Sequence, residues 1–179
     1  MWVLDTGIVG TDVVCPAKLV VFDLHTSRLL RRIEIPKDVA TNSTTGRGLL
    51  VTPVVQNVRR PFCHKINVSL IYREMKRESP MIKHVDATQV YIADVEGYGL
   101  IVYNGDSFRR LTSSAFDADL RHENYTIEGQ TFQLDDGILG MAISPRRSRL
   151  YFSPMTSHNL NFVRTEDLQL RGDAAKYVV

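Results

Sequence analysis

The apolar residues of this chain fall into short runs that are separated by polar turns, and the arrangement occurs three times. The first runs are residues 2–5, 90–94 and 150–153, and the second runs are residues 18–23, 99–104 and 159–163. Short apolar runs rich in β-branched and aromatic residues and bounded by turn residues are typical of strands. We therefore expect three antiparallel hairpins, and hairpins that recur along a chain predict a β-propeller.

A further strand is expected after two of these hairpins, at residues 29–34 and 107–111. Each follows a tight turn, Thr26-Ser27 in the first case and Gly105-Asp106 in the second. In this interpretation each hairpin is the inner strand pair of one blade. The fold class is predicted to be all-β, with blades of four-stranded antiparallel sheets.

The first interval between repeats is longer than the second, because residues 64–85 intervene. Asp5 and Asp94 are 89 residues apart, whereas Tyr91 and Tyr151 are 60 apart. The 22 residues at 64–85 lack a two-residue alternation and the turn chemistry of their neighbours. Without this segment the first interval shortens to 67 residues, so we treat it as an atypical insertion.

The charge pattern argues against nucleic acid as a partner. The chain has 22 basic and 20 acidic residues, and its arginine pairs are scattered along the sequence. A nucleic-acid interface gathers basic residues on one face. No apolar run approaches the roughly 18 residues of a membrane span, so no membrane segment is expected.

The sequence contains no catalytic or metal-binding motif such as His-Glu-x-x-His, Cys-x-x-Cys or a phosphate-binding loop. Asp135 and Asp136 precede Gly137 and an apolar run, where turn chemistry explains them. We therefore expect no metal and no cofactor. Among the five histidines, His158 is the candidate of interest, because it follows the first strand of the third repeat.

Loops that leave the first strand of each blade would form one rim of a propeller channel. The candidate ligand-facing residues there are Asp5, Thr6, Asp94, Glu96, Tyr98, Phe152, Ser153 and His158. Carboxylates beside aromatic rings suit a small aromatic amine, because the acid pairs with the ammonium group and the ring stacks. The alternative is that Asp5 and Asp94 close turns and that Tyr98 packs between blades.

Several blocks of residues together resemble the insect yellow and major royal jelly protein family. They are residues 2–7, 15–24, 29–36, 91–103, 136–145 and 150–154. The resemblance covers nearly the whole chain and implies a six-bladed propeller of roughly twice this length. Residues 1–179 are then a fragment of one domain with about three blades. The resemblance also implies a secreted protein whose signal peptide lies before Met1, and it leaves the oligomeric state open.

The cysteines and glycosylation sequons fit an extracellular protein. Cys15 and Cys63 match the family's two cysteine positions, which implies a disulfide; two reduced thiols are the alternative. Sequons occur at Asn42, Asn67 and Asn124. The family has no counterpart of residues 64–85, which are either a surface loop or a translated intron.

Some members of the family convert dopachrome, and this implies a role in cuticle pigmentation or melanin-precursor chemistry. Asp94 or Glu96 would serve as the base and Tyr98 as the hydrogen-bond donor that holds the developing oxyanion, although no motif establishes an enzyme. Residues 97–103 and 136–141 resemble the yellow branch in particular. The alternatives are a secreted binding protein for catechol or indole amines, or a storage or structural protein like those of royal jelly.

Overall fold

The computed structural model describes residues 1–57 and 88–169, and strands dominate it, which confirms the all-β class. The strands are β1 (Trp2–Asp5), β2 (Ile8–Val9), β3 (Asp12–Val13), β4 (Lys18–Phe22), β5 (Leu29–Glu34), β6 (Leu50–Asn57), β7 (Thr88–Asp94), β8 (Gly99–Tyr103), β9 (Phe108–Thr112), β10 (Asn124–Ile127), β11 (Gln130–Gln133), β12 (Ile138–Ile143), β13 (Arg149–Pro154) and β14 (Asn161–Arg164). The helical segments are α1 (Lys37–Ala40) and the 3₁₀ turns η1 (Ser114–Phe116), η2 (Leu120–His122) and η3 (Asp167–Gln169). None of the helices among the described residues has the length and apolar character needed to cross a membrane.

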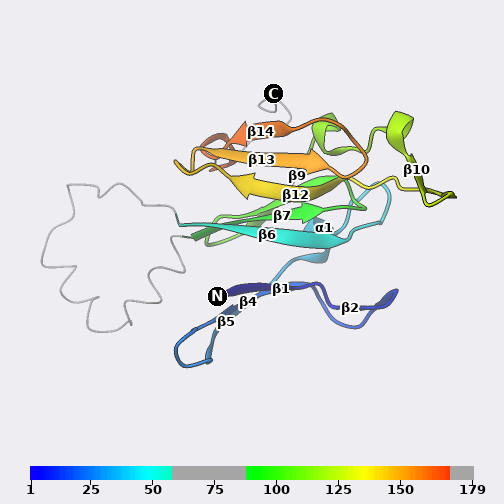
Figure 1. Ribbon diagram of the computed structural model, residues 1–179. Helices are drawn as coiled ribbons and strands as arrows, with labels where there is room; N and C mark the ends of the chain where they lie inside the picture. The colour runs from blue at the N-terminus through cyan, green and yellow to red at the C-terminus, as the bar shows by residue number, and fades with distance from the viewer. Residues whose placement is uncertain (58–87, 170–179) are drawn as a thin grey trace, which may run out of the picture.

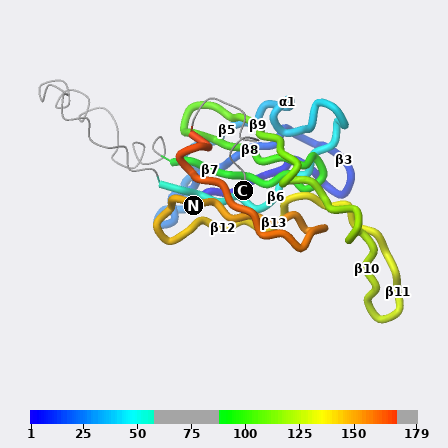
Figure 2. Tube along the Cα trace, turned by 90° about the horizontal axis from the view of Figure 1, so that it is seen from above, coloured from blue at the N-terminus to red at the C-terminus, as the bar shows by residue number. Residues whose placement is uncertain are grey.

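Three antiparallel sheets form stacked layers, as Figure 1 shows. The first sheet has the order β1-β4-β5, the middle sheet β6-β7-β8-β9 and the third sheet β12-β13-β14. Two hairpins, β2–β3 and β10–β11, lie outside these layers, and β10–β11 projects from the body of the molecule (Figure 2). Each predicted hairpin and both predicted outer strands are present, with ends that shift by at most two residues.

The middle sheet is buried on both faces, which explains its continuous apolar runs. In β7, Tyr91 and Ala93 belong to the core shared with the third sheet, whereas Val90 and Ile92 belong to the core shared with the first sheet. Successive side chains of a strand point to opposite faces, so a strand between two sheets has apolar residues at successive positions, as residues 90–93 of β7 do. Full burial of a Val, Ile or Leu side chain contributes roughly 1.5–3 kcal/mol.

Aromatic pairs fill both cores. Phe116 packs edge-on against Phe152 between the middle and third sheets, with ring centroids 5.2 Å apart. Tyr103 lies between Trp2 and Phe108 on the other side of the middle sheet, at centroid distances of 6.1 and 4.8 Å. The Trp2–Tyr103 contact joins the first and middle sheets, and the Phe116–Phe152 contact joins η1 to the third sheet.

The prediction that each hairpin begins with the innermost strand of its blade is wrong for the middle and third sheets, and among the described residues only the middle sheet has the predicted four strands. Here β6 and β12 pair with β7 and β13 as additional edge strands, and β6 lies beside β12 and β1. The sequence obscured β6 because Pro53 interrupts it. Proline is tolerated at this edge since Thr52, with φ of 45°, forms a bulge in the ladder.

Strands β6 and β7 stay paired as far as Asn57 and Thr88, so residues 58–87 connect two neighbouring strand ends. The predicted insertion at 64–85 lies outside the described residues, as do Cys63 and Asn67.

Candidate functional site

Most of the predicted ligand-facing residues lie at one end of the three layers. Asp5 ends β1, Asp94 ends β7 and Pro154 ends β13, and in Figure 1 β7 and β13 point toward the same side. The turns that follow these strands therefore gather on one rim. These turns do not form a single pocket, because each candidate side chain contacts residues of its own turn or sheet.

Asp94 is fully buried, and both of its carboxylate oxygens accept hydrogen bonds from neighbouring residues. Its Oδ1 accepts hydrogen bonds from the backbone N–H groups of Leu49 (2.7 Å) and Gly97 (3.0 Å), and its Oδ2 accepts one from Arg110 Nη2 (2.6 Å). Arg110 also donates to the carbonyl oxygens of Gly97 (2.6 Å) and Val39 (3.1 Å). This network connects the β7–β8 turn to Leu49, which precedes β6, to β9 and to α1.

Gly97 is required at this turn. A Cβ built on it would lie 2.1 Å from Asp94 Oδ2 and 2.4 Å from Arg110 Nη2. Any side chain there would displace the buried ion pair.

A polar cluster covers the exposed side of the same turn. The Tyr98 hydroxyl donates a 2.6 Å hydrogen bond to the backbone oxygen of Asp135. Arg47 bridges two acids, with its Nη1 3.5 Å from Asp135 Oδ2 and its Nε 3.8 Å from Glu96 Oε2. Burial, and then the negative charge of Asp135, raise the pKa of Tyr98, so its hydroxyl stays protonated at neutral pH.

Asp5 and Thr6 close a turn at the end of β1. Asp5 Oδ1 accepts a hydrogen bond from Gly7 N (2.9 Å), and its Oδ2 lies 2.9 Å from Lys18 Nζ. The hydrogen bond from Lys18 and then that from Gly7 lower the pKa of Asp5. Lys18 Nζ also lies 3.0 Å from Cys15 Sγ, and these two hydrogen bonds raise the pKa of Lys18, with that to Cys15 the larger cause.

The candidates of the third sheet do not line a common site. Phe152 is buried in the core against Phe116 and cannot reach a ligand at the rim. Ser153 Oγ donates to Asn159 O (3.0 Å). His158 contacts the ring of His122, with centroids 4.1 Å apart, and His122 Nε2 lies 3.8 Å from Asp119 Oδ2. The described residues contain no group of three or more His, Cys, Asp or Glu side chains that could hold a metal ion.

The same end of the molecule contains a cavity of about 630 Å³, which we call the apolar cavity. Its lining comes from the β2–β3 hairpin, the segment before β4, the end of β5, α1 and the start of β6. The lining residues are Thr6, Ile8, Val13, Val14, Cys15, Pro16, Ala17, Glu34, Ile35, Pro36, Lys37, Ala40, Thr41, Gly48 and Leu50. Sequence reasoning identified only Thr6 and Cys15 among them as residues of interest.

One sequence signal could have pointed to this cavity: apolar residues at positions 8, 9, 13 and 14 flank the turn residues Gly10 and Thr11. The β2–β3 hairpin contains valines at positions 9, 13 and 14 that remain 68%, 77% and 62% exposed. Exposed apolar side chains that cluster on one element indicate a contact surface. Ile8, Val13 and Val14 line the cavity, whereas Val9 does not.

The residues predicted to be modified are partly described. Cys15 is half-buried and unpaired among the described residues, and its predicted partner Cys63 lies outside them. Asn42 Nδ2 donates to Gly97 O (2.9 Å), and Asn124 is exposed on β10. The glycosylation sites and the disulfide remain predictions.

Comparison with known proteins identifies the family. A family model described as "Major royal jelly protein" matches residues 1–177. The chain is 49% identical to major royal jelly protein 9 of Apis mellifera over 93% of its own length and 34% of that relative. It is 44% identical to major royal jelly protein 8 (93% and 35%) and 43% identical to major royal jelly protein 1 (94% and 35%) of the same organism. The chain thus spans about a third of the length of the curated relatives it matches. The resemblance is confirmed, and the chain belongs to the major royal jelly protein family.

Proposed function

We propose that this chain is part of a secreted propeller protein that binds a small aromatic ligand in the apolar cavity and releases it unchanged. The observation on which this proposal depends is the cavity of about 630 Å³, whose size falls in the range of small-molecule sites. The names of the relatives refer to royal jelly, which supports an extracellular location.

The stacked sheets support the propeller architecture. The three layers share their cores face to face, and β6 and β12 lie beside each other at the sheet edges. Neighbouring blades of a propeller pack in this way around a channel. We propose that the layers are consecutive blades of a six-bladed ring, of which residues 1–179 form a part.

The lining of the apolar cavity favours a ligand with an apolar or aromatic body and one polar end. Ile8, Val14 and Leu50 offer apolar surface, and the charged lining residues Glu34 and Lys37 are both exposed. Glu34 could pair with a ligand ammonium group there. Aromatic amines of the catechol and indole type combine these two features.

Binding has more support than catalysis. A general base needs a carboxylate that can reach substrate, but Asp94 is fully buried and bonded to Arg110, Leu49 and Gly97. Glu96 interacts with Arg47, and the Tyr98 hydroxyl donates to Asp135. Melanin-precursor chemistry in cuticle pigmentation therefore has less support, and a storage or structural role is compatible with the family.

Calorimetric titration of the complete protein with serotonin and dopamine tests the proposal, with chromatography of the ligand afterwards. We expect saturable heat and unchanged ligand. The variant Val14→Trp fills the cavity and should weaken binding at least tenfold, whereas Val9→Trp on the same hairpin should leave it unchanged because Val9 does not line the cavity. Absent heat with both ligands would remove the binding proposal. Conversion of the ligand, or of added dopachrome, faster than in buffer would favour the enzyme instead.

A further inference from the structure

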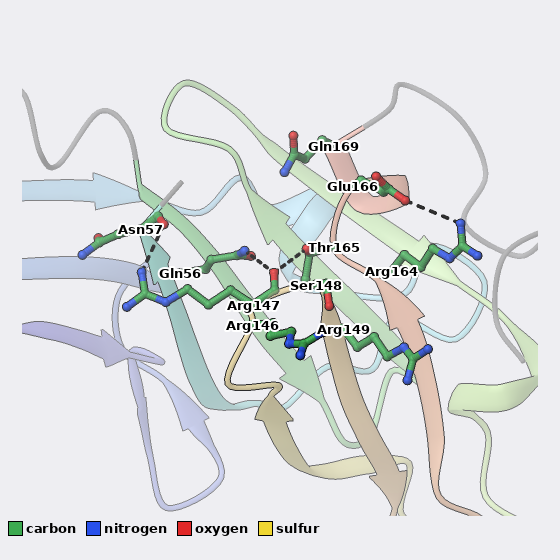
Figure 3. Close-up of a pocket in the computed structure, with 10 residues that line it drawn as sticks. All are labelled: Gln56, Asn57, Arg146, Arg147, Ser148, Arg149, Arg164, Thr165, Glu166 and Gln169. Atoms are coloured by element: carbon green, nitrogen blue, oxygen red, sulfur yellow. Dashed lines mark hydrogen bonds and ion pairs between the residues drawn. The ribbon is translucent and has the colours of Figure 1, made fainter. Parts of the chain in front are cut away.

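A second cavity, of about 740 Å³, lies at the opposite end of β6 from the apolar cavity. Figure 3 shows its lining, to which β6, the β12–β13 turn, β14 and η3 contribute. Four arginines and one acid line it: Arg146, Arg147, Arg149, Arg164 and Glu166. Their net charge of +3 exceeds the +2 of the whole chain, so positive charge is concentrated here. We call this site the basic cavity.

We propose that the basic cavity binds a small molecule that bears two or more phosphate or sulfate groups. Guanidinium groups match the geometry of these oxyanions and form two parallel hydrogen bonds with each. The volume of the cavity is suited to a small molecule.

The turn that presents three of the arginines is held rigidly. Arg147 has a φ of 57°, a left-handed conformation that is costly for a side chain with a Cβ. Its carbonyl oxygen accepts hydrogen bonds from Gln56 Nε2 (2.8 Å) and Thr165 Oγ1 (2.8 Å), both on buried residues. Strained backbone that buried partners hold in place often occurs at binding sites.

The support for this turn continues into the core. Gln56 Oε1 accepts a 2.6 Å hydrogen bond from the hydroxyl of Tyr91, whose pKa is raised by burial. On the other side of the turn, Ser144 Oγ accepts hydrogen bonds from the N–H groups of Ser148 and Arg149, each 3.1 Å long. A turn fixed from both sides loses little conformational entropy when it binds a ligand.

The guanidinium groups retain donors for a ligand. Arg147 Nη1 makes one long contact, 3.3 Å, to Asn57 O. Arg149 lies over the ring of Phe162, 4.8 Å from its centroid, which orients the group without using its N–H donors. Arg164 pairs with Glu166 at 3.5 Å, but both side chains are mostly exposed, so the pair is weak and can be exchanged for an anion.

The arrangement of these groups favours several anionic groups over one. In Figure 3, Arg147 extends to one side of the cavity, and Arg149 and Arg164 extend to the other. A single phosphate or sulfate ion offers only one anionic group to these two sides. A molecule with anionic groups at separate positions offers one to each.

Isothermal titration of the full chain at low ionic strength tests this inference. The probes are inositol hexakisphosphate, sucrose octasulfate, inorganic phosphate and inorganic sulfate. We expect at least one of the two polyanions to bind at least 100-fold more tightly than the single ions, with affinity that falls as salt is added. The variant Arg146→Gln/Arg149→Gln should weaken that binding roughly tenfold or more, as expected for lost charge-assisted hydrogen bonds.

The matched control is Arg28→Gln/Arg121→Gln, which removes the same charge at exposed positions outside the basic cavity. It should retain the affinity of the unmodified chain. Tight binding of only the hexakisphosphate identifies phosphate as the ligand group, and tight binding of only the octasulfate identifies sulfate. The inference is overturned if neither polyanion binds more tightly than the single ions, or if both double variants weaken binding equally.

Discussion

Arg110 Nη2 donates a 2.6 Å hydrogen bond to Asp94 Oδ2, and the two side chains are 10% and 0% exposed. The pair joins β9 to the end of β7, and the remaining bonds of each partner reach Leu49 before β6, α1 and the β7–β8 turn. Such a pair cannot lose one partner without leaving the other charge buried and unpaired. The pair stabilises the end of the sheets at which the apolar cavity lies.

The first prediction concerns this pair. Asp94→Ala should lower the free energy of unfolding by about 3–5 kcal/mol, because Arg110 would be left buried without its counter-charge. Urea unfolding followed by circular dichroism measures the loss. Asp119→Ala is the matched control, since it removes a more exposed pair, in which Arg121 is 84% and Asp119 19% exposed. A loss for Asp119→Ala as large as that for Asp94→Ala would contradict the structural role of Asp94.

The second prediction concerns the segment between β6 and β7. Asn57 and Thr88 are paired strand neighbours, so a short turn can connect these strands. Deletion of residues 64–85 should therefore leave the far-ultraviolet circular dichroism spectrum unchanged and the melting temperature within a few degrees. Replacement of the same 22 residues by a Gly/Ser linker of equal length is the control. Unfolding of both variants would show that these residues contribute to the fold.

The third prediction concerns pH. The hydrogen bonds from Arg121, first from its side chain and then from its backbone, lower the pKa of Asp119 from 3.8 to about 2. A carboxyl whose pKa is lower in the folded state adds stability above its unfolded pKa, and this contribution is lost as the pH falls from about 4 to about 2. In Arg121→Gln, carbon NMR titration should show the Asp119 pKa returning toward 3.8.

The pKa of Asp23 is the internal control for that titration. It is lowered mainly by a hydrogen bond from the backbone N–H of His25 and should not respond to Arg121→Gln. An unchanged Asp119 pKa in the variant would contradict the assigned cause.

The fourth prediction concerns the cysteines. If Cys15 and Cys63 are bonded in the secreted protein, the bridge closes a loop of about 48 residues and contributes roughly 3–4 kcal/mol in the chain-entropy model. Alkylation without reduction, followed by mass spectrometry of peptides, should leave both cysteines unlabelled and yield a linked peptide. Complete alkylation of both would establish two free thiols instead.

Strand positions were predictable because they depend on local pattern. The continuous apolar runs of β7 and β8 reflect burial on two faces, and the turn at Ser27, with φ of 53°, lies where the sequence indicated it. Strand β6 was missed because Pro53 is atypical of a strand, and only the bulge at Thr52 makes it acceptable.

The sites were less predictable because they depend on contacts between distant residues. From the sequence alone, Asp94 is expected to be an accessible acid. In the fold, Arg110 and the backbone amide of Leu49 donate hydrogen bonds to its carboxylate. The pair Arg146-Arg147 looked isolated in the sequence, but β14 places Arg164 beside the β12–β13 turn that carries it. The apolar cavity has no motif, since its walls come from five separate elements.

The most direct test of the account is a structure of the complete protein with serotonin or dopamine bound. We expect the ligand between the β2–β3 hairpin and α1, in contact with Val14 and Leu50, and the three sheets as consecutive blades of a closed ring. Ligand density at another position, with the apolar cavity empty, would contradict the account.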